Sequence, residues 1–182
     1  MRGVRIIAGE HRGARIFAPP GQETRPTSDR AREAAFNLIG PVDGAEVLDL
    51  FAGSGAMGLE ALSRGAARAV FVETDRDASR AIDRNLDKLR LTGATVLQRD
   101  AIQVLAEEAA RGRRYDLVLV DPPYEMFNSL QSSLSRHLPA VLAREGVVVV
   151  ETDAREEPEL PALGLRTSRR YGSARITIFE QP

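Results

Sequence analysis

The segment from Leu48 to Gly58, LDLFAGSGAMG, has a glycine pattern that could bind a nucleotide-like cofactor. Gly53, Gly55 and Gly58 have the spacing G-x-G-x-x-G and follow an apolar run typical of a strand. Glu73 lies about 20 residues further on, where a carboxylate commonly binds ribose hydroxyls. The pattern fits a nicotinamide or flavin enzyme, and it fits equally an enzyme whose nucleoside cofactor has no pyrophosphate.

A second group of polar residues follows another apolar run, in the segment YDLVLVDPPYE. Ligands of an open α/β sheet gather at the carboxyl ends of its strands, which would put Asp121, Pro122 and Tyr124 beside the glycine turn. A carboxylate and a carbonyl can accept both hydrogens of an exocyclic base amine, and an aromatic ring can stack on the base. The segment therefore predicts chemistry on an amine. The alternative is a rigid turn, because Asp-Pro and Pro-Pro commonly end strands.

The composition excludes several other kinds of site. The chain has no cysteine, so it has no disulfide, no thiolate nucleophile and no zinc site built on sulfur. Its two histidines, His11 and His137, are far apart in the sequence and predict no metal site.

The elements that would position these residues alternate between short β-branched runs and helical patterns, which is typical of a parallel sheet covered by helices. The predicted strands are residues 47–51, 69–73, 95–99, 116–120 and 147–151. Asp75 is placed to cap the helix between the second and third strands, whose apolar residues recur at helical spacing: Ala78, Ile82, Leu86 and Leu89. After residue 151, two extended runs separated by Gly172 and Ser173 predict an antiparallel hairpin, so the sheet should be mixed.

Residues 1–40 form a separate unit, which we call the arm. Residues 4–9 and 14–19 read as two short strands of a hairpin, and Ser28 can cap a following helix. The arm is too short to hold a core of its own, so we expect it to dock on the main domain, residues 41–182. The net charge of the whole chain is −1, but the charge of residues 1–32 is clearly basic. The net charge argues against a protein that coats nucleic acid indiscriminately. The basic N-terminal segment is compatible with a local basic surface.

The length and hydropathy predict one main core. The chain has 182 residues, of which 43% are hydrophobic, and it contains no apolar stretch long enough to span a bilayer. Arginines interrupt the first 17 residues before a signal-type apolar region could form. We therefore expect a cytoplasmic protein that does not associate with membranes.

These motifs, in this order, resemble those of S-adenosylmethionine-dependent amino-methyltransferases. The resemblance rests on DLFAGSGAMG, Glu73, RDA at residues 99–101, and DPPY at residues 121–124. Three further segments, RIIAGEHRGARI, RPTSDRAREAAFN and RRYGSARITIFE, resemble the bacterial family that methylates the N2 amine of a guanine in 16S ribosomal RNA. The resemblance implies an α/β, Rossmann-like methyltransferase fold: a mixed seven-stranded sheet with helices on both faces, a C-terminal hairpin and the small arm.

The resemblance also implies roles for individual residues. S-adenosyl-L-methionine would be bound by one set: Asp49, Phe51, Gly53, Gly55, Glu73, Asp100, Ala101, Arg25 and Thr27. The acceptor amine would be held by Asp121 and the Pro122 carbonyl, with Tyr124 stacked on the base. Four arm residues would contact RNA: Arg5, Arg12, Arg15 and Arg32. Arg25 and Arg32 belong to a segment that the resemblance also places close to the cofactor, so their substitution would affect both ligands.

The implied partner is 16S ribosomal RNA, within the small subunit or an assembly intermediate, acted on by a monomer without a metal. Because DPPY is shared with DNA adenine and cytosine amine methyltransferases, another amine, on a DNA base or a protein glutamine, is the main alternative. A nicotinamide-dependent oxidoreductase is a weaker one, since no histidine for proton transfer is evident near the expected site.

Overall fold

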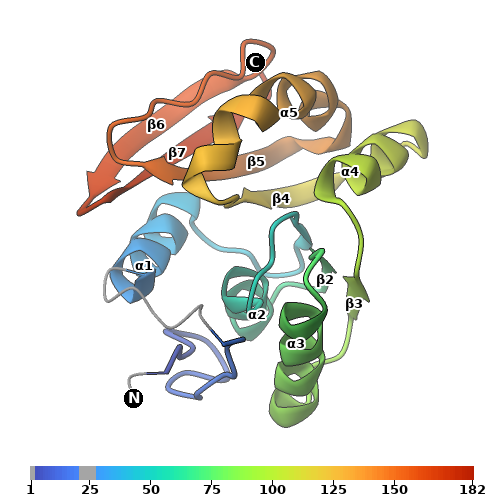
Figure 1. Cartoon of the computed structure of the whole chain (residues 1–182), viewed down its shortest axis with the longest axis vertical. Helices are drawn as coiled ribbons and strands as arrows, with labels where there is room; N and C mark the ends of the chain where they lie inside the picture. Colours follow the sequence, from blue (N-terminus) through green and yellow to red (C-terminus); the bar gives the residue numbers. More distant parts are fainter. Residues whose placement is uncertain (1–2, 21–27) are drawn as a thin grey trace.

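One seven-stranded sheet runs through the protein, whose computed structural model describes residues 3–20 and 28–182 (Figure 1). Its strands are β1 (Glu46–Asp49), β2 (Arg68–Val72), β3 (Ala94–Leu97), β4 (Tyr115–Val120), β5 (Leu142–Asp153), β6 (Gly164–Tyr171) and β7 (Ala174–Glu180). They lie in the order β3-β2-β1-β4-β5-β7-β6. The first five strands pair in parallel, and β7 pairs antiparallel with both β5 and β6. The predicted mixed α/β sheet with a C-terminal hairpin is therefore confirmed.

The central strands carry near-continuous apolar runs because both of their faces are covered. Val118 and Val120 of β4 lie in the core on one face, and Leu117 and Leu119 lie in the core on the other. The observed β5 is longer than the predicted residues 147–151, since it begins at Leu142, directly after a helix. The first residues of β5 include the polar Arg144 and Glu145, so a search for apolar runs does not find this part of the strand.

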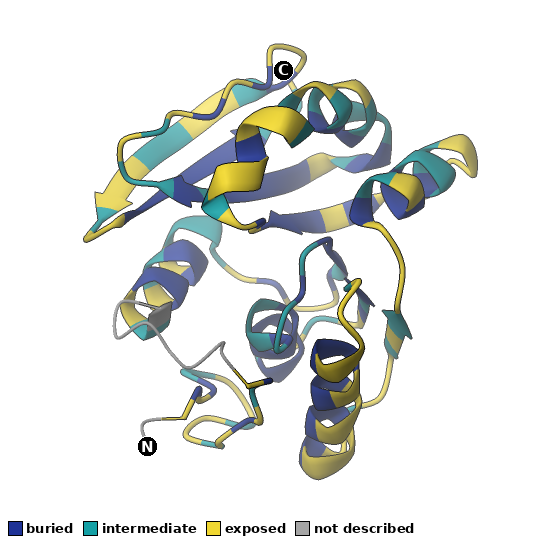
Figure 2. Ribbon diagram, viewed as in Figure 1, coloured by how far each residue is buried: buried dark blue, intermediate teal, exposed yellow. Residues whose placement is uncertain are grey.

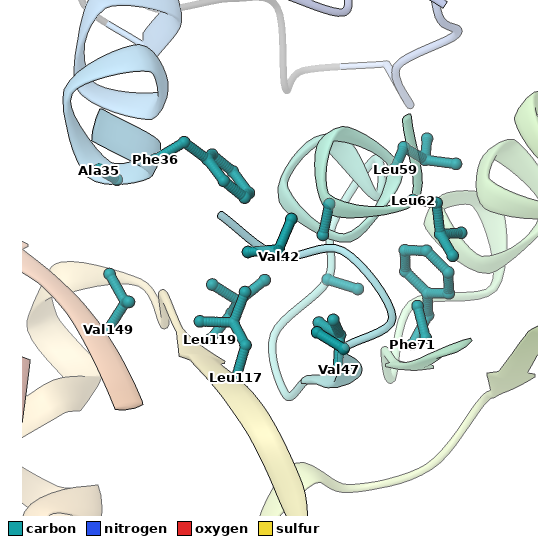
Figure 3. Close-up of a cluster of buried hydrophobic side chains, with 14 of the residues drawn as sticks. Ala35, Phe36, Val42, Val47, Leu59, Leu62, Phe71, Leu117, Leu119 and Val149 are labelled. Atoms are coloured by element: carbon teal, nitrogen blue, oxygen red, sulfur yellow. The ribbon is translucent and has the colours of Figure 1, made fainter. Parts of the chain in front are cut away.

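Helices cover both faces of the sheet. On the face that also carries the arm lie α1 (Ser28–Ile39), α2 (Ala56–Ser63) and α3 (Arg76–Leu89), and on the other lie α4 (Ala101–Ala110) and α5 (Phe127–Val141). Figure 3 shows part of the first core, to which α1 contributes Phe36, α2 contributes Leu59, β2 contributes Phe71 and β4 contributes Leu119. The two separate cores hold the sheet, and with it the strand ends, in a fixed position.

The helix α3 has the capping and amphipathic pattern predicted for it. The Asp75 carboxylate accepts a hydrogen bond of 2.7 Å from the backbone N–H of Ala78. The four apolar residues of the predicted face are buried, namely Ala78, Ile82, Leu86 and Leu89. The opposite side of α3 is exposed (Figure 2). A cap satisfies an otherwise unpaired donor of the first turn, which explains why the helix begins at Arg76.

The arm is less regular than predicted. Residues 4–9 and 14–19 do lie antiparallel, but they form a single isolated bridge, Arg5 to Arg15, in place of two strands. The turn between them contains Gly9 and Gly13, whose φ angles of 83° and 84° suit glycine. The prediction of a two-stranded hairpin is therefore corrected to a single bridge. Several backbone N–H groups of this segment bind side chains of α2 and α3, so fewer of them pair between the two runs.

Side chains of α2 and α3 hold the backbone of the arm, and we call Glu60, Ser63 and Asn85 the arm anchor. The buried Glu60 carboxylate accepts bonds of 2.9 and 3.0 Å from the N–H groups of Ile7 and Ala8. Ser63 Oγ donates to the carbonyl of Ala8, and Asn85 bonds both the N–H and the C=O of Phe17. Three apolar side chains from residues 3–20 of the arm join the core on this face of the sheet: Val4, Ile6 and Ile16.

Candidate functional site

A cavity of about 510 Å³ opens where the parallel strands end. Its walls come from the segments after β1, β2 and β4, the start of α4, the end of β5 and the inner side of α1. Eight residues predicted to bind the cofactor or the acceptor amine line it: Asp49, Phe51, Gly53, Glu73, Asp100, Ala101, Asp121 and Pro122. Parallel strands bring their carboxyl ends to one edge, so residues distant in sequence meet there.

The glycine turn is held in place by the carboxylate at the end of β2. Gly53 has a φ of 56°, and its N–H donates to Glu73 Oε2 at 2.8 Å. The other oxygen, Oε1, accepts from the N–H of Asp75 at 2.9 Å. Each carboxylate oxygen has a second acceptor position, so Glu73 can fix the turn and still accept hydroxyl groups of a ligand.

The three glycines of the fingerprint have different roles. Gly55 has a φ of 83° and precedes α2, a conformation that side chains rarely adopt. At Gly58, by contrast, an added Cβ would lie 2.3 Å from the Phe71 ring, so this glycine allows α2 to pack against β2. Gly53 lines the cavity, whereas Gly55 is not among its lining residues.

Asp49 is an acid buried at the floor of the cavity. It is 2% exposed and accepts a 3.1 Å hydrogen bond from the N–H of Gly58. Burial raises the pKa of Asp49 to about 7; the Gly58 hydrogen bond opposes this shift, and the nearby charge of Glu73 adds to it. A cationic ligand bound beside Asp49 would stabilise the ionised form of this carboxyl.

The start of α4 forms another wall. Asp100 caps the helix by accepting from the N–H of Gln103 at 2.9 Å, and Ala101 is buried beside it. Arg99 lines the cavity too, with its guanidinium paired to Glu107. Asp100 therefore has a structural role in capping while it also faces the cavity.

The DPPY segment leaves β4 at the mouth of the cavity. Asp121 is exposed and Pro122 is buried, and both line the cavity. Tyr124 begins the short 3₁₀ helix η1 (Tyr124–Met126), and its hydroxyl lies 3.3 Å from Glu151 Oε1 at the far end of β5. Tyr124 is not itself a lining residue, so the structure places it at the rim.

The arginines with predicted roles fall into three groups. Arg5, Arg12 and Arg15 are exposed, and Arg5 is paired to Asp29 at 3.3 Å. Arg25 lies outside the described residues, as does Thr27. Arg32 differs from its prediction as an RNA contact, because it is 4% exposed.

The position of Arg32 has a clear physical basis. Its guanidinium donates to the carbonyl of Arg5 at 2.6 Å and to Asp29 at 2.9 Å, and it lies 3.7 Å from Glu60. It also lines the cavity. Arg32 therefore joins α1 to residues 3–20 of the arm and lies at the cavity, near the expected cofactor site, and not on the exposed surface of the arm.

Two functional features escaped the sequence reasoning. Glu151 lines the cavity, and its place at the end of a predicted strand was a signal that could have identified it. The arm anchor had no such signal, since Glu60 and Asn85 read as ordinary polar residues of amphipathic helices.

Two further observations concern metals and membranes. Among the described residues, no group of three or more His, Asp or Glu side chains is arranged to hold a metal ion. No helix within residues 3–20 and 28–182 has the length and hydrophobicity of a membrane-spanning segment.

Comparison with known proteins identifies relatives over nearly the whole chain. The family model described as Conserved hypothetical protein 95 matches residues 4–180. Ribosomal RNA small subunit methyltransferase D of Escherichia coli (strain K12) is 40% identical over 167 residues, which cover 87% of this chain and 80% of that protein. YlbH of Bacillus subtilis (strain 168) is 37% identical over 186 residues, or 98% of this chain and 99% of that protein.

The fold agrees with these relatives. The solved structure of yhhF from Escherichia coli matches with a TM-score of 0.86 and 34% identity, and the match covers 98% of both chains. The residues that line the cavity, from Val4 to Ile176, all lie within residues 4–180, the range that the family model matches. The chain therefore belongs to the family of the bacterial ribosomal RNA small subunit methyltransferase D, a family of S-adenosyl-L-methionine-dependent methyltransferases.

Proposed function

We propose that this enzyme transfers a methyl group from S-adenosyl-L-methionine to the exocyclic N2 amine of a guanine in 16S ribosomal RNA. The observation that carries the proposal is the meeting of Asp121 and Pro122 with the glycine turn in one cavity. The name of the Escherichia coli relative, a small subunit methyltransferase, supports ribosomal RNA as the substrate class.

The chemistry of the cavity fits this cofactor better than a dinucleotide. S-adenosyl-L-methionine supplies a methyl group on a positively charged sulfur, which departs as a neutral thioether. The carboxyl of Asp49, buried beside the glycine turn, favours a cationic ligand and in its ionised form would repel a pyrophosphate. A volume of about 510 Å³ lies within the range of small-molecule sites.

We assign the cofactor contacts by their position in the cavity. Asp49, Phe51 and Gly53 would surround the methionine part, Glu73 would accept the ribose hydroxyls, and Asp100 with Ala101 would border the adenine. Glu73 keeps acceptor capacity after binding the Gly53 and Asp75 N–H groups. Roles for Arg25 and Thr27 remain part of this proposal and lie outside the described residues.

At the acceptor end, the protein orients the amine and takes up its proton. The nitrogen lone pair of guanine N2 is delocalised into the ring, so acceptors at Asp121 and the Pro122 carbonyl would draw the two N–H groups toward a pyramidal nitrogen. Tyr124 would stack on a base turned out of its surroundings, which contributes about 1–3 kcal/mol. When the N–C bond forms, the nitrogen becomes acidic and releases one proton to Asp121 or to water. No strong base is required, and the rate comes from positioning and electrostatics.

The substrate and the cofactor can be tested together. The protein is incubated with labelled S-adenosyl-L-methionine and with small ribosomal subunits, naked 16S ribosomal RNA or DNA, and the nucleosides are identified by mass spectrometry. We expect N2-methylguanosine from a ribosomal substrate, formed about a hundredfold or more slowly with Asp121→Ala. Label in DNA, or on a different nucleoside, would refute the proposed acceptor while leaving the methyltransferase class in place.

A further inference from the structure

From the geometry of the site we infer that Glu151 reads the N1–H of the acceptor base and thereby selects guanine. The inference rests on the proposed function and extends it to a residue that neither the motifs nor the family resemblance assigned. Guanine presents two neighbouring donors on one edge, the N2 amine and N1–H, whereas adenine and cytosine present a lone pair at the equivalent ring nitrogen. A site specific for guanine N2 therefore needs an acceptor beyond the two that hold the amine.

The register of the sheet places Glu151 next to Asp121. Val120 of β4 pairs with Val150 of β5, and each of the two acids is the next residue of its chain. Neighbouring strands lie about 4.8 Å apart, so the two acids leave the sheet from adjacent positions at the same edge. Both acids line the cavity.

The two acids also lie on the same face of the sheet. Leu119 and Val149 belong to the core on the α1 face, and side chains two residues apart in a strand point the same way. Ile176 of β7, which pairs with Glu151, belongs to that core and lines the cavity as well. Glu151 thus lines the cavity beside the apolar Ile176, where the acceptor base would bind.

Tyr124 supplies an independent link between Glu151 and the acceptor base. Its hydroxyl donates to Glu151 Oε1 at 3.3 Å, so one carboxylate oxygen is oriented by the ring that would stack on the base. A charged acceptor facing N1–H favours guanine, and the same acceptor facing a ring lone pair repels it. Glu151 would therefore select the base, while Asp121 serves the reacting amine.

The inference is tested with 2-aminopurine, which keeps the exocyclic 2-amine but has a lone pair at N1. In the smallest RNA that the enzyme methylates, the target guanine is replaced by 2-aminopurine, and kcat/KM is measured for both substrates. We expect Glu151→Ala to reduce the preference for guanine at least about tenfold. The missing O6 of 2-aminopurine affects both enzymes alike, so it cancels when the two preferences are compared.

Tyr124→Phe is the matched control, because it removes the hydroxyl that bonds Glu151 and keeps the carboxylate. We expect its preference for guanine to stay within about threefold of the wild type. Thermal unfolding with and without cofactor shows that each variant is folded, and Glu151→Gln replaces Glu151→Ala if the latter is not.

One result would overturn the inference alone: an unchanged preference for guanine in the folded Glu151 variant. Failure of the wild type to methylate guanine N2 at all would instead overturn the proposed function and the inference with it.

Discussion

At the scale of single residues, Asp121 is the sharpest test of the chemistry. The side chain is exposed at the mouth of the cavity, so its removal should affect turnover more than folding. We expect Asp121→Ala to lower kcat by about two orders of magnitude or more, the effect of losing one preorganised polar partner. The affinity for S-adenosyl-L-methionine, measured by calorimetry, should change little. Near-normal turnover of this variant would place the chemistry elsewhere in the cavity.

Asp49 predicts a pH dependence of cofactor binding. Its pKa of about 7 means that the free protein holds a proton there below neutral pH, and a cationic ligand favours the ionised form. Affinity for S-adenosyl-L-methionine should therefore rise as pH increases from 6 to 8, by up to about tenfold. The same raised pKa makes the free protein bind more protons than the unfolded chain above about pH 4, so this residue's contribution to stability falls as pH rises toward 7.

Asp49→Asn is the control for this dependence. The amide has nearly the same shape and does not titrate, so the rise in affinity should be absent or much reduced. The amino group of the ligand titrates equally with both proteins, and the difference between them isolates the carboxyl. An identical pH profile in wild type and variant would show that Asp49 stays ionised throughout.

At the scale of elements, Asn85 couples the arm to the glycine turn through α3. Its amide bonds the N–H and C=O of Phe17 and also donates to the carbonyl of Ser54 at 3.2 Å. Asn85→Ala should lower the free energy of unfolding by about 1–3 kcal/mol, because buried backbone groups lose their partner. Amide hydrogen exchange at Phe17 should accelerate.

Asp83 on the exposed side of α3 offers the matched comparison, and Asp83→Ala should change stability by no more than about 0.5 kcal/mol in the same denaturant titration. Equal stability of the Asn85 and Asp83 variants would mean that water replaces the amide at no cost, and that the arm is held by its apolar contacts alone.

The elements also show where sequence reasoning works and where it stops. The strands around Leu119 and Val149 were predictable because buried parallel strands need continuous apolar residues, and Asp75 was predictable because a cap acts on its own helix. The arm was not, because its backbone binds Glu60, about 50 positions away in the chain. A local pattern does not record such a contact, so two strands were expected where one bridge exists.

The same contrast applies to the site. The eight lining residues predicted to bind the cofactor or the amine meet in the cavity because strand ends converge by topology, which a correct fold prediction already implies. The orientation of Arg32 depends instead on the packing of α1 against residues 3–20 of the arm and against Glu60. An arginine in an exposed-looking segment was assigned to RNA, whereas the structure buries it among the carboxylates of Asp29 and Glu60.

At the scale of the whole molecule, the arm and the cavity should bind different parts of the substrate. If the exposed Arg5, Arg12 and Arg15 contact phosphates, replacing all three with alanine should weaken RNA binding and reduce its salt dependence by about one charge for each arginine. The affinity for S-adenosyl-L-methionine should not change, since none of the three lines the cavity. Filter binding at several salt concentrations measures the slope.

A triple variant that binds and methylates the ribosomal substrate normally across this range would make the arm a stabilising appendage. The RNA surface would then have to be sought around Tyr124 and the segment that follows it. Arg144, which is exposed near the start of β5, provides the comparison: Arg144→Ala removes one charge outside the arm and can be compared with each single arginine substitution.

The arm anchor has one more consequence, for how the family can diversify. Glu60, Ser63 and Asn85 bind main-chain atoms of the arm, and every residue type except proline offers the same N–H and C=O groups. Beyond its few buried apolar positions, the arm can therefore exchange side chains without loosening its attachment. Only a proline at Ile7 or Ala8 would remove a donor that Glu60 requires. If the exposed arginines of the arm bind RNA, as we propose, the side chains of this RNA surface can change without altering how the arm is attached.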